Sequence, residues 1–241
     1  MQNNSNPDYS GDVILSEIDL NLVNYSSHIV RLFLNSLDFD LCKNSRILDF
    51  GAGQGTLAEI IKRETGIVPV CAEIDPRLVV ILEGKGFTAH QELSAIDLRF
   101  DLIYSSNVLE HIEFDVDALK DLANRLEKAG RLVIYVPAFP LLFSKLDLSV
   151  GHFRRYRKRE LVRKLDSAGF SVISSEYSDS VGFFATLFLK FLRFSFEPGT
   201  KTSILMKFYD SLVVPISIFL DGIGFKYLFG KNLFVVAKLL D

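Results

Sequence analysis

The chain has 241 residues, of which 49% are hydrophobic and 24% charged, and a formal net charge of −3. This length and apolar content suffice for one large domain with a buried core, and we expect a single domain. The net charge gives no global basic field of the kind that drives non-specific nucleic-acid binding, so no nucleic-acid partner is predicted. Cys42 and Cys71, the only cysteines, lie in or beside apolar runs. They predict buried free thiols rather than a disulfide framework or a zinc site.

Residues 1–19 are polar and rich in Asn, Ser and Asp, and we expect them to form a mobile lead-in to a domain over 20–241. They lack the basic start and apolar core of a signal peptide. The longest uncharged stretch near the C-terminus, 211–220, is roughly half of the ~20 residues that a membrane-spanning helix needs. The sequence therefore predicts a cytoplasmic protein that does not cross a bilayer.

A first helix is expected over about 20–37, and from Arg46 onward short apolar runs alternate with longer stretches of helical period. The runs are RILDF, GIVPVCAEI, FDLIYSS and GRLVIYV. This alternation predicts βαβ units and a parallel sheet with helices on both faces. The helix in DALKDLANRLEKAG is expected to end at Gly130, and the helix in KRELVRKLDSAGF at Gly169 before a strand in FSVISSEY.

Residues 180–229 contain ten Phe residues and are interpreted as a helical insertion before a last strand in KNLFVVAKLL. Apolar residues at helical spacing predict two helices here, and Pro215 is expected to kink or end the second. The first helix would place Phe184, Leu187, Phe188 and Phe191 on one face. Three interpretations stay open: a lid over an apolar acceptor, a surface that touches a membrane, or a dimer interface. The Phe content favours the first two, and in the second the basic residues Lys190, Arg193, Lys201 and Lys207 would face anionic headgroups.

The stretch RILDFGAGQGTLAEI places Gly51, Gly53 and Gly55 between an apolar strand and a helix. Backbone N–H groups without a Cβ, beside a helix N-terminus, predict a seat for the polar part of a nucleotide-like ligand. The dinucleotide fingerprint G-x-G-x-x-G is incomplete, because Thr56 stands where its third glycine would be. Asp49 would also repel a pyrophosphate, so the loop favours a cationic ligand over NAD.

Glu73 ends the next predicted strand, where an acid can accept both hydrogen bonds of a ribose diol. With Asp49 and the three glycines, this pattern resembles the class I S-adenosylmethionine-dependent methyltransferases, whose first motif is an acid followed by G-x-G-x-G. The segment FDLIYSSNVLEHI strengthens the resemblance with Asp101 in its strand and LEH after it. The resemblance covers roughly 24–180 and the last strand.

The resemblance implies an α/β fold: a Rossmann-like, doubly wound, mostly parallel seven-stranded sheet with the helical insertion before its last strand. It implies S-adenosylmethionine as cofactor and S-adenosylhomocysteine as product. Asp49 and the glycine loop would hold the methionine portion, and Asn107 would lie close to it. Glu73 would hold the ribose hydroxyls and Ile74 would contact the adenine.

Two segments at the expected ligand edge of the sheet carry candidate acceptor residues. His111, after the fourth strand, is the first candidate for a general base or for a residue that orients the acceptor. The segment after the fifth strand resembles a subgroup of small-molecule methyltransferases with a GH-x-RRY signature, often found alongside glycosyltransferases of surface-glycan or polyprenyl-linked pathways. Its candidate catalytic residues are Asp147 and His152, and its candidate substrate-binding residues are Arg154, Arg155 and Tyr156, with Tyr25 from the first helix. Paired arginines suit a carboxylate or phosphate, although RRYRKRE also fits a solvated helix start and His152 a helix cap or core residue.

We therefore expect a methyltransferase acting on a small-molecule, glycan-related or lipid-linked acceptor, with oxygen favoured as the acceptor atom and no metal site predicted. The Asn/Asp-Pro-Pro-aromatic motif of adenine and glutamine N-methylation is missing, since SSNVLEH stands in its place. An NAD-dependent oxidoreductase and a non-catalytic cofactor-binding scaffold are the alternatives. The oligomeric state stays open, and peripheral membrane association is compatible with a cytoplasmic location.

Overall fold

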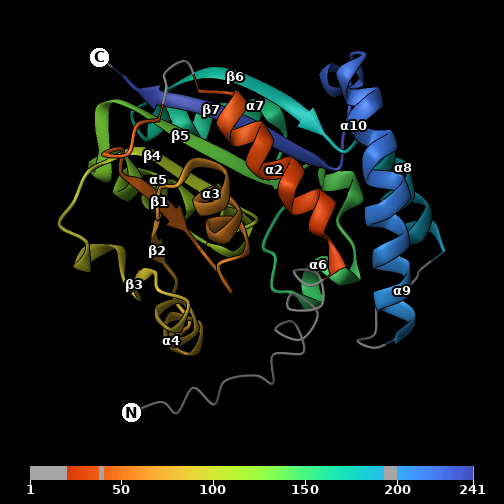
Figure 1. The fold of residues 1–241 in the computed structure, drawn as a ribbon. Helices are drawn as coiled ribbons and strands as arrows, with labels where there is room; N and C mark the ends of the chain where they lie inside the picture. Colours follow the sequence, from red (N-terminus) through yellow and green to blue (C-terminus); the bar gives the residue numbers. More distant parts are fainter. Residues whose placement is uncertain (1–20, 38–40, 193–199, 241) are drawn as a thin grey trace, which may run out of the picture.

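The computed structural model describes residues 21–37, 41–192 and 200–240, so the predicted lead-in lies outside the described residues. A seven-stranded sheet in the order β3-β2-β1-β4-β5-β7-β6 forms the centre of the molecule (Figure 1). β7 runs antiparallel to both β5 and β6, and the other neighbouring strands are parallel. The predicted doubly wound, mostly parallel seven-stranded fold is confirmed.

The elements follow one another in βα alternation until the last third of the chain. The strands are β1 Ile47–Phe50, β2 Val70–Ala72, β3 Thr88–His90, β4 Phe100–Ser106, β5 Leu126–Pro137, β6 Phe170–Ser178 and β7 Asn232–Leu239. The α-helices are α2 Val23–Asn35, α3 Thr56–Thr65, α4 Pro76–Gly84, α5 Asp115–Arg125, α6 Lys145–Ser149, α7 Lys158–Ser167, α8 Ser180–Phe191, α9 Thr200–Phe208 and α10 Val214–Gly222. Short 3₁₀ turns are η1 Leu93–Ala95, η2 Leu109–His111, η3 Pro140–Leu142 and η5 Phe225–Tyr227, and η4 Tyr209–Val213 is a π-turn.

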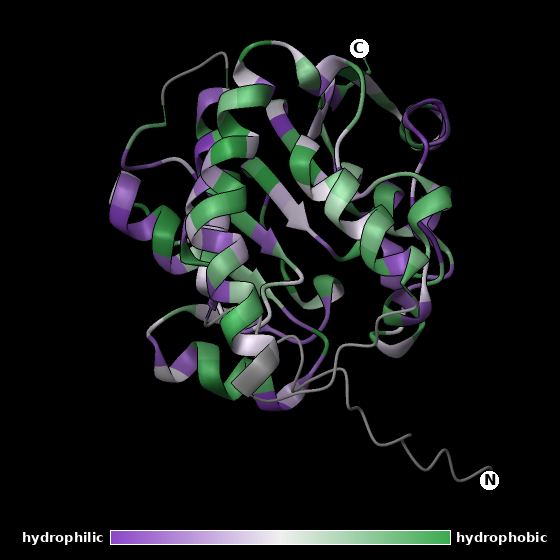
Figure 2. Ribbon diagram, turned by 90° about the vertical axis from the view of Figure 1, so that its right-hand side faces the viewer, coloured by the Kyte–Doolittle hydropathy of each residue, from purple (hydrophilic) through white to green (hydrophobic). Residues whose placement is uncertain are grey.

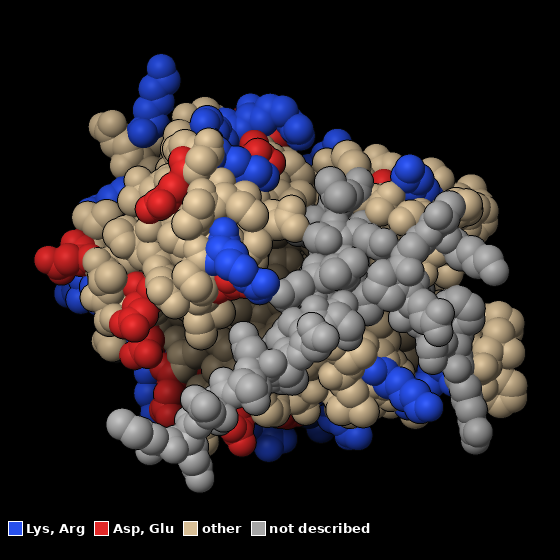
Figure 3. Space-filling model, turned by 90° about the horizontal axis from the view of Figure 1, so that it is seen from below, with Lys and Arg blue, Asp and Glu red and all other residues tan. Residues whose placement is uncertain are grey.

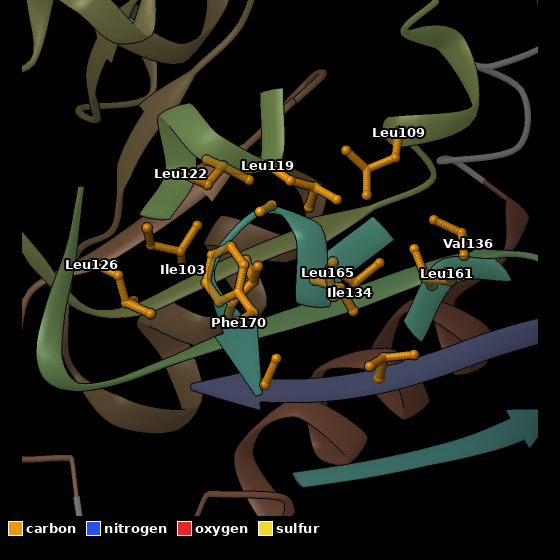
Figure 4. Packing of buried hydrophobic residues seen from close by; sticks show 14 of the residues in the cluster. Ile103, Leu109, Leu119, Leu122, Leu126, Ile134, Val136, Leu161, Leu165 and Phe170 are labelled. Atoms are coloured by element: carbon orange, nitrogen blue, oxygen red, sulfur yellow. The ribbon is translucent and has the colours of Figure 1, made fainter. Parts of the chain in front are cut away.

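Two hydrophobic layers form because neighbouring strand residues point to opposite faces of the sheet. In β4, Leu102 packs with α2 and α3, whereas Ile103 packs with α5 and α7. Figure 4 shows the second layer, where side chains from α5 and α7 meet Ile103 and Ile134 of the central strands. Full burial of each Leu or Ile stabilises the fold by about 1.5–3 kcal/mol. This packing fixes the strands, so the loops after β1, β2, β4 and β5 meet at the carboxyl edge.

Two local predictions are wrong. Helix α5 ends at Arg125 rather than at Gly130, because Leu126 already pairs with Phe100 of β4 and the chain enters β5 there. Cys42 is exposed rather than buried, whereas Cys71 is buried as predicted. The expected end of α7 is confirmed, since Gly169 follows it with φ +88°, a left-handed conformation that favours glycine.

The helix of the insertion does not end at Pro215, so that alternative of the prediction is wrong. α9, η4 and α10 join into one helix over Thr202–Gly222. The π-turn lies just before Pro215, which stands in the first turn of α10. Pro215 has no N–H to donate to the preceding turn, and the carbonyl of Asp210 in that turn accepts from Asn24 Nδ2 at 3.2 Å. The apolar segment is therefore about twice as long as the sequence predicts: with 21 residues and a mean hydropathy of 1.6, this helix could span a membrane by length and composition alone.

Candidate active site

The glycine loop links β1 to α3 at the carboxyl edge of the sheet. Gly51, Gly53 and Gly55 have φ values of +80°, +55° and +85°, all in the left-handed region that side chains disfavour. A Cβ at Gly51 would lie 2.2 Å from Val108 Cγ2, so this glycine is also needed for packing. A Cβ at Gly53 would meet no atom within 4 Å. The backbone at Gly53 therefore faces open space and is accessible to a ligand.

Asp49 lies in β1 just before this loop and is buried. The hydroxyl of Tyr104, on neighbouring β4, donates a 2.7 Å hydrogen bond to Asp49 Oδ2. Burial, followed by the negative charge of Asp49, raises the pKa of Tyr104 well above its usual range. The phenol therefore stays protonated and orients the carboxylate. The sheet thus holds a buried acid two residues before the first glycine, as the motif predicts.

Glu73 follows β2, and its carboxylate turns toward the glycine loop. Oε2 accepts a 2.7 Å hydrogen bond from the backbone N–H of Gly53, and Oε1 accepts one of 3.0 Å from that of Asp75. The residue is only 9% exposed, so it is not an ordinary solvated surface acid. Its neighbour Ile74, in contrast, is 81% exposed. An apolar side chain open to solvent beside an oriented carboxylate fits the base and ribose of an adenosine.

Asn107 directly follows β4 at the carboxyl edge of the sheet. It adopts φ +54°, and its backbone N–H donates to the carbonyl of Tyr135 on β5. Its side-chain amide donates to Ser106 Oγ at 3.2 Å. A non-glycine residue in this backbone conformation is uncommon and is often found at functional sites. The structure thus brings the predicted cofactor residues to one edge of the sheet.

A histidine–carboxylate cluster lies at the same edge, immediately after Asn107 in the chain. The His111 ring meets the His152 ring edge to face, with centroids 4.6 Å apart, although 41 positions separate the two in sequence. Glu110 is fully buried beside them, and its Oε1 lies 3.8 Å from His152 Nε2. Burial raises the pKa of Glu110 to about 8. Burial, followed by the nearby His152, lowers the pKa of His111 to about 4, so this imidazole is neutral at pH 7.

Asp147 orients His152 within this cluster. Its Oδ1 accepts hydrogen bonds from His152 Nδ1 at 2.9 Å and from Arg155 Nε at 2.7 Å. Its Oδ2 accepts from the backbone and hydroxyl of Ser144, which caps α6. Burial alone would raise the pKa of Asp147, but the hydrogen bond from His152 and the charge of Arg155 outweigh it and hold the pKa at about 2. Asp147 is therefore an anion that leaves Nε2 as the free nitrogen of His152.

The predicted substrate-binding residues mostly make contacts within the protein. Arg155 is buried against Asp147, and Arg154 forms a 2.9 Å ion pair with Asp115. Tyr156 is fully buried and donates hydrogen bonds to Asp115 Oδ2 and to the carbonyl of Leu109. These bonds hold the GH-x-RRY segment against η2, which carries Glu110 and His111. A direct role of the three side chains in acceptor binding stays a prediction.

Tyr25 is the remaining predicted substrate-binding residue, and it lies buried on α2. Its hydroxyl accepts a 2.8 Å hydrogen bond from Asn232 Nδ2, and Lys231 Nζ lies 5.0 Å from the centre of its ring. The ring packs edge to face on Tyr135. These contacts hold the side chain against β5 and β7, and the backbone N–H of Tyr25 donates to Asp210 Oδ1 of the insertion at 2.9 Å. A contact of Tyr25 with an acceptor stays a prediction.

A groove of about 590 Å³ lies beyond the histidine cluster, where β5 and β6 end. Its lining combines aromatic and aliphatic with basic side chains: Phe139, Pro140, Leu141, Arg157, Lys158, Arg159, Tyr177, Tyr227 and Leu228. Arg157 and Arg159 are exposed and form no ion pair with the described residues. On the face seen from below, basic and acidic side chains are scattered around a central hollow rather than gathered into one basic patch (Figure 3).

The sequence analysis did not assign a role to Glu110 or to this groove. Glu110 stands within the quoted LEH motif, but its burial and lack of hydrogen-bond partners depend on contacts with the distant segment 147–155. The groove is formed by η3, α7, β6 and η5, which no single sequence motif connects.

Comparison with known proteins decides the family. A family model described as a methyltransferase domain matches residues 25–175, which is more than half of the chain. The chain belongs to this methyltransferase family. S-adenosylmethionine is its cofactor, and the carboxylates Asp49 and Glu73, the open backbone at Gly53 and the exposed Ile74 fit that molecule. Family membership decides against the dehydrogenase alternative and for the methyltransferase. No curated protein matches the chain.

Solved structures share the fold at low sequence identity. One is a chain of the complex between the Haloferax volcanii Trm112 methyltransferase activator and a putative methyltransferase, at 12% identity and TM-score 0.65, covering 99% of this chain and 100% of that one. A methyltransferase from Archaeoglobus fulgidus matches at 17% identity and TM-score 0.56, covering 90% and 93%. A phosphoethanolamine N-methyltransferase from Haemonchus contortus matches at 17% identity and TM-score 0.59, covering 90% of this chain but 53% of its own. At these identities the similarity establishes the fold of the methyltransferase.

Proposed function

We propose that this methyltransferase transfers the methyl group to a hydroxyl oxygen of an amphipathic, lipid-like or lipid-linked acceptor while its insertion rests on a membrane surface. One observation carries the proposal: the helix over 202–222 exposes a continuous apolar row to solvent, while three polar side chains on its other side are buried in the protein. Around it, the domain 20–241 works as one unit in the cytoplasm, associated with the membrane through residues 180–229.

The outward side of this helix is a continuous apolar row. Its exposed members are Ile204, Phe208, Leu212, Ile216, Phe219 and, just beyond the helix, Ile223. They recur every three or four residues and therefore lie on one face. The inward side is mixed: Asp210, Ser217 and Asp221 are buried beside the apolar Met206 and Val214. A surface helix of a globular protein turns its apolar stripe toward the core, whereas this helix exposes a second apolar row.

Helix α8 extends this apolar face. Phe184, Phe188 and Phe191 are 54%, 61% and 84% exposed, so the predicted Phe stripe points outward. α8 packs beside α10, and both helices are largely hydrophobic on the side of the molecule that Figure 2 shows. Exposed apolar surface on this scale marks an interaction site, and helices of this kind lie in the headgroup region of membranes.

Basic side chains at the edge of this face complement an anionic lipid surface. Lys190 and Lys207 are exposed, and Lys190 Nζ donates to the carbonyl of Leu141. The predicted Arg193 and the side chain of Lys201 lie outside the described residues. Tyr227 and Leu228 are 64% and 69% exposed and belong both to the apolar face and to the groove lining. An acceptor anchored in the membrane can therefore enter the groove from this side.

The groove supports an acceptor with an apolar body and an anionic group. Phe139 stacks on Tyr177 with ring centroids 4.7 Å apart, which gives the groove an aromatic wall. Arg157 and Arg159 offer free guanidinium groups on the same groove, suited to a phosphate or carboxylate. The groove and the cofactor loop lie on the same edge of the sheet, with the histidine cluster placed between them in strand order.

The chemistry needs a group that receives the acceptor proton. S-adenosylmethionine supplies a methyl group on a sulfonium sulfur; as the C–O bond forms, the C–S bond breaks and the hydroxyl proton must leave. We assign this proton to His152 Nε2, because Asp147 holds Nδ1 and stabilises the positive ring that results. His111 packs on that ring and orients the acceptor oxygen beside it. Alignment of acceptor oxygen and methyl carbon supplies the rest of the rate enhancement.

The test combines membrane binding with methyl transfer. Vesicles containing anionic lipid should float the protein more strongly than neutral vesicles, and labelled methyl groups should enter the organic-extractable fraction of a lipid pool. Replacing Phe188 and Phe219 together by Ser should reduce vesicle binding at least about tenfold, because several hundred Å² of apolar contact is lost. The matched control Leu98→Ser removes an exposed leucine outside this face and should bind vesicles as the wild type does.

Two results would overturn this proposal. Label recovered only in water-soluble acceptors would reject the lipid-like substrate. Failure to bind any vesicle, together with a stable dimer or a complex with a small activator protein, would assign the apolar face to a protein partner instead. The Haloferax volcanii complex shows that a protein of this fold occurs with such an activator.

A further inference from the structure

Glu110 presents a buried carboxylate that the surrounding protein does not satisfy. The residue is 0% exposed, and neither carboxyl oxygen accepts a hydrogen bond from another residue within the described ranges 21–37, 41–192 and 200–240. A buried carboxylate normally has hydrogen-bond donors, a paired cation or a metal ion, because desolvation without a partner is strongly unfavourable. The described residues therefore leave this carboxylate without a hydrogen-bonding partner, and a bound cation would supply one.

Two imidazoles bring donor nitrogens close to this carboxylate. One donor atom from each of Glu110, His111 and His152 lies within 4.8 Å of the others, and His152 Nε2 is 3.8 Å from Glu110 Oε1. The part of the chain that the structure describes offers the His111 ring no hydrogen bond. Tetrahedral zinc with bonds of about 2.0–2.2 Å has donors about 3.4 Å apart. The donor atoms thus need to approach one another by up to about 1.4 Å when the ion binds.

The neighbours of the cluster prepare His152 for metal binding. Asp147 accepts the hydrogen bond from Nδ1 and thereby directs Nε2 toward Glu110. A metal-bound histidine almost always donates its other ring N–H to a carboxylate, a carbonyl or water. Arg155 and Ser144 donate hydrogen bonds to the carboxylate oxygens of Asp147. These bonds hold the carboxylate in place, so it orients His152 without being a metal ligand itself.

We propose that Glu110, His111 and His152 bind one divalent transition-metal ion, with Zn²⁺ the best match. Two imidazoles and one carboxylate are a ligand set typical of zinc and related ions, and three protein ligands leave a position open. The proposal departs from the sequence analysis, which predicts no metal site, because 41 positions separate the two histidines.

The role of the ion rests on the proposed function, whereas its binding does not. An acceptor hydroxyl at the open position would lose its proton more readily, because the cation stabilises the oxyanion. His111 and His152 would then be ligands, and the hydroxyl proton would pass to solvent rather than to a free imidazole. Sensitivity of methyl transfer to chelators separates these two routes.

The binding test uses the full chain, stripped with a chelator and titrated with Zn²⁺ against a chromogenic competitor. We expect one Zn²⁺ per chain and, at a hundredfold excess over the dissociation constant, a rise in melting temperature of about 5 °C or more. His111→Asn and His152→Asn should each weaken binding by more than about 100-fold, and Asp147→Asn by about 10- to 100-fold. Glu110→Gln should also weaken binding while preserving side-chain volume.

Matched controls exclude adventitious surface binding. Glu113→Gln, His90→Asn and Cys42→Ser change the same residue types outside the cluster and should bind Zn²⁺ as the wild type does. Co²⁺ should give visible d–d bands without a sulfur-to-cobalt charge-transfer band, even where Glu110→Gln folds poorly. Stoichiometric binding that disappears only with Cys42→Ser, or no binding at all, overturns the metal site. Methyl transfer to lipid without Zn²⁺ binding would reject the metal site and leave the proposed function intact. Zn²⁺ binding without methyl transfer to lipid would support the metal site and reject the proposed function.

Discussion

Two helices of this protein, α7 and the helix over 202–222, use amphipathicity in opposite directions. α7 buries Leu161 and Leu165 against the sheet and exposes charged residues such as Arg163 and Asp166. The helix over 202–222 buries Asp210 and Asp221 and exposes Phe208 and Phe219.

The periodicity of apolar residues identifies the faces of a helix, but it does not identify which face packs against the protein. In α7 the hydrophobic effect alone selects the orientation. In the insertion, buried polar bonds select it: Asp210 binds the N-terminus of α2, and Asp221 Oδ2 accepts from the backbone N–H of Asp179 at 2.8 Å. The proposed membrane contact would give the exposed apolar face a second apolar medium.

Of the changes that test this comparison, removal of the Asp210 carboxylate should have the largest effect on the free energy of unfolding. Asp210 accepts hydrogen bonds of 2.9 Å from the backbone N–H groups of Asn24 and Tyr25 in the first turn of α2. Asp210→Ala leaves both donors unsatisfied and removes a negative charge from a helix N-terminus. We expect the free energy of unfolding to fall by about 2 kcal/mol in urea denaturation.

The adjacent Ser211→Ala is the matched control, because Ser211 is exposed and only donates to the carbonyl of Phe208. It should change the free energy of unfolding by less than about 0.5 kcal/mol. Equal effects of the two variants would mean that the inward polar face does not hold the helix in place.

A pH titration should give the next largest effect. His28 on α2 lines the same small interior space as Ser217 and Asp221, and burial lowers its pKa from 6.5 to about 4. Between pH 6.5 and about pH 4, His28 is protonated in the unfolded chain but neutral in the native protein. The free energy of unfolding therefore falls as the pH decreases below 6.5. From pH 6.5 to 5 the expected loss is about 1.5 kcal/mol in the free energy of unfolding.

His28→Gln removes this titration and is the reference for the pH series. The wild type and the variant should diverge as the solution is acidified from pH 6.5 and run in parallel above pH 7. Parallel curves at all pH values would show that His28 is solvated and that the insertion does not pack on α2 as described.

The cofactor half of the site could be predicted because one short stretch of chain contains it. Asp49, Gly51, Gly53 and Gly55 are nearly adjacent, and Glu73 follows the very next strand, so the βα alternation alone brings them to one edge. The alternation predicts the parallel sheet, whereas the seven-stranded doubly wound fold was implied by the resemblance to class I methyltransferases. Their backbone conformations are also local, since left-handed φ values select glycine.

The remaining parts depend on contacts between distant segments. The environment of Glu110 requires His152 and Asp147, and the direction of the Phe stripe depends on Asp179, Asp210 and Asp221. The sequence could not show whether the helix ends at Pro215, because its continuation accompanies a preceding π-turn that propensity does not reveal. No local pattern reports such long-range contacts.

Substitution of Phe208 should have the smallest effect on the free energy of unfolding. It also tests most directly whether the apolar face of the helix over 202–222 is exposed. Phe208→Ser in water should change the free energy of unfolding by less than about 0.5 kcal/mol, because the ring is 54% exposed and stabilises no core. Met206→Ser, two residues earlier and 8% exposed, should cost about 2 kcal/mol or more because it removes buried apolar contacts. Urea denaturation of both variants, without lipid, measures the pair. A large loss for Phe208→Ser would show that the outward face is covered by protein, and the apolar face could then no longer be assigned to a membrane.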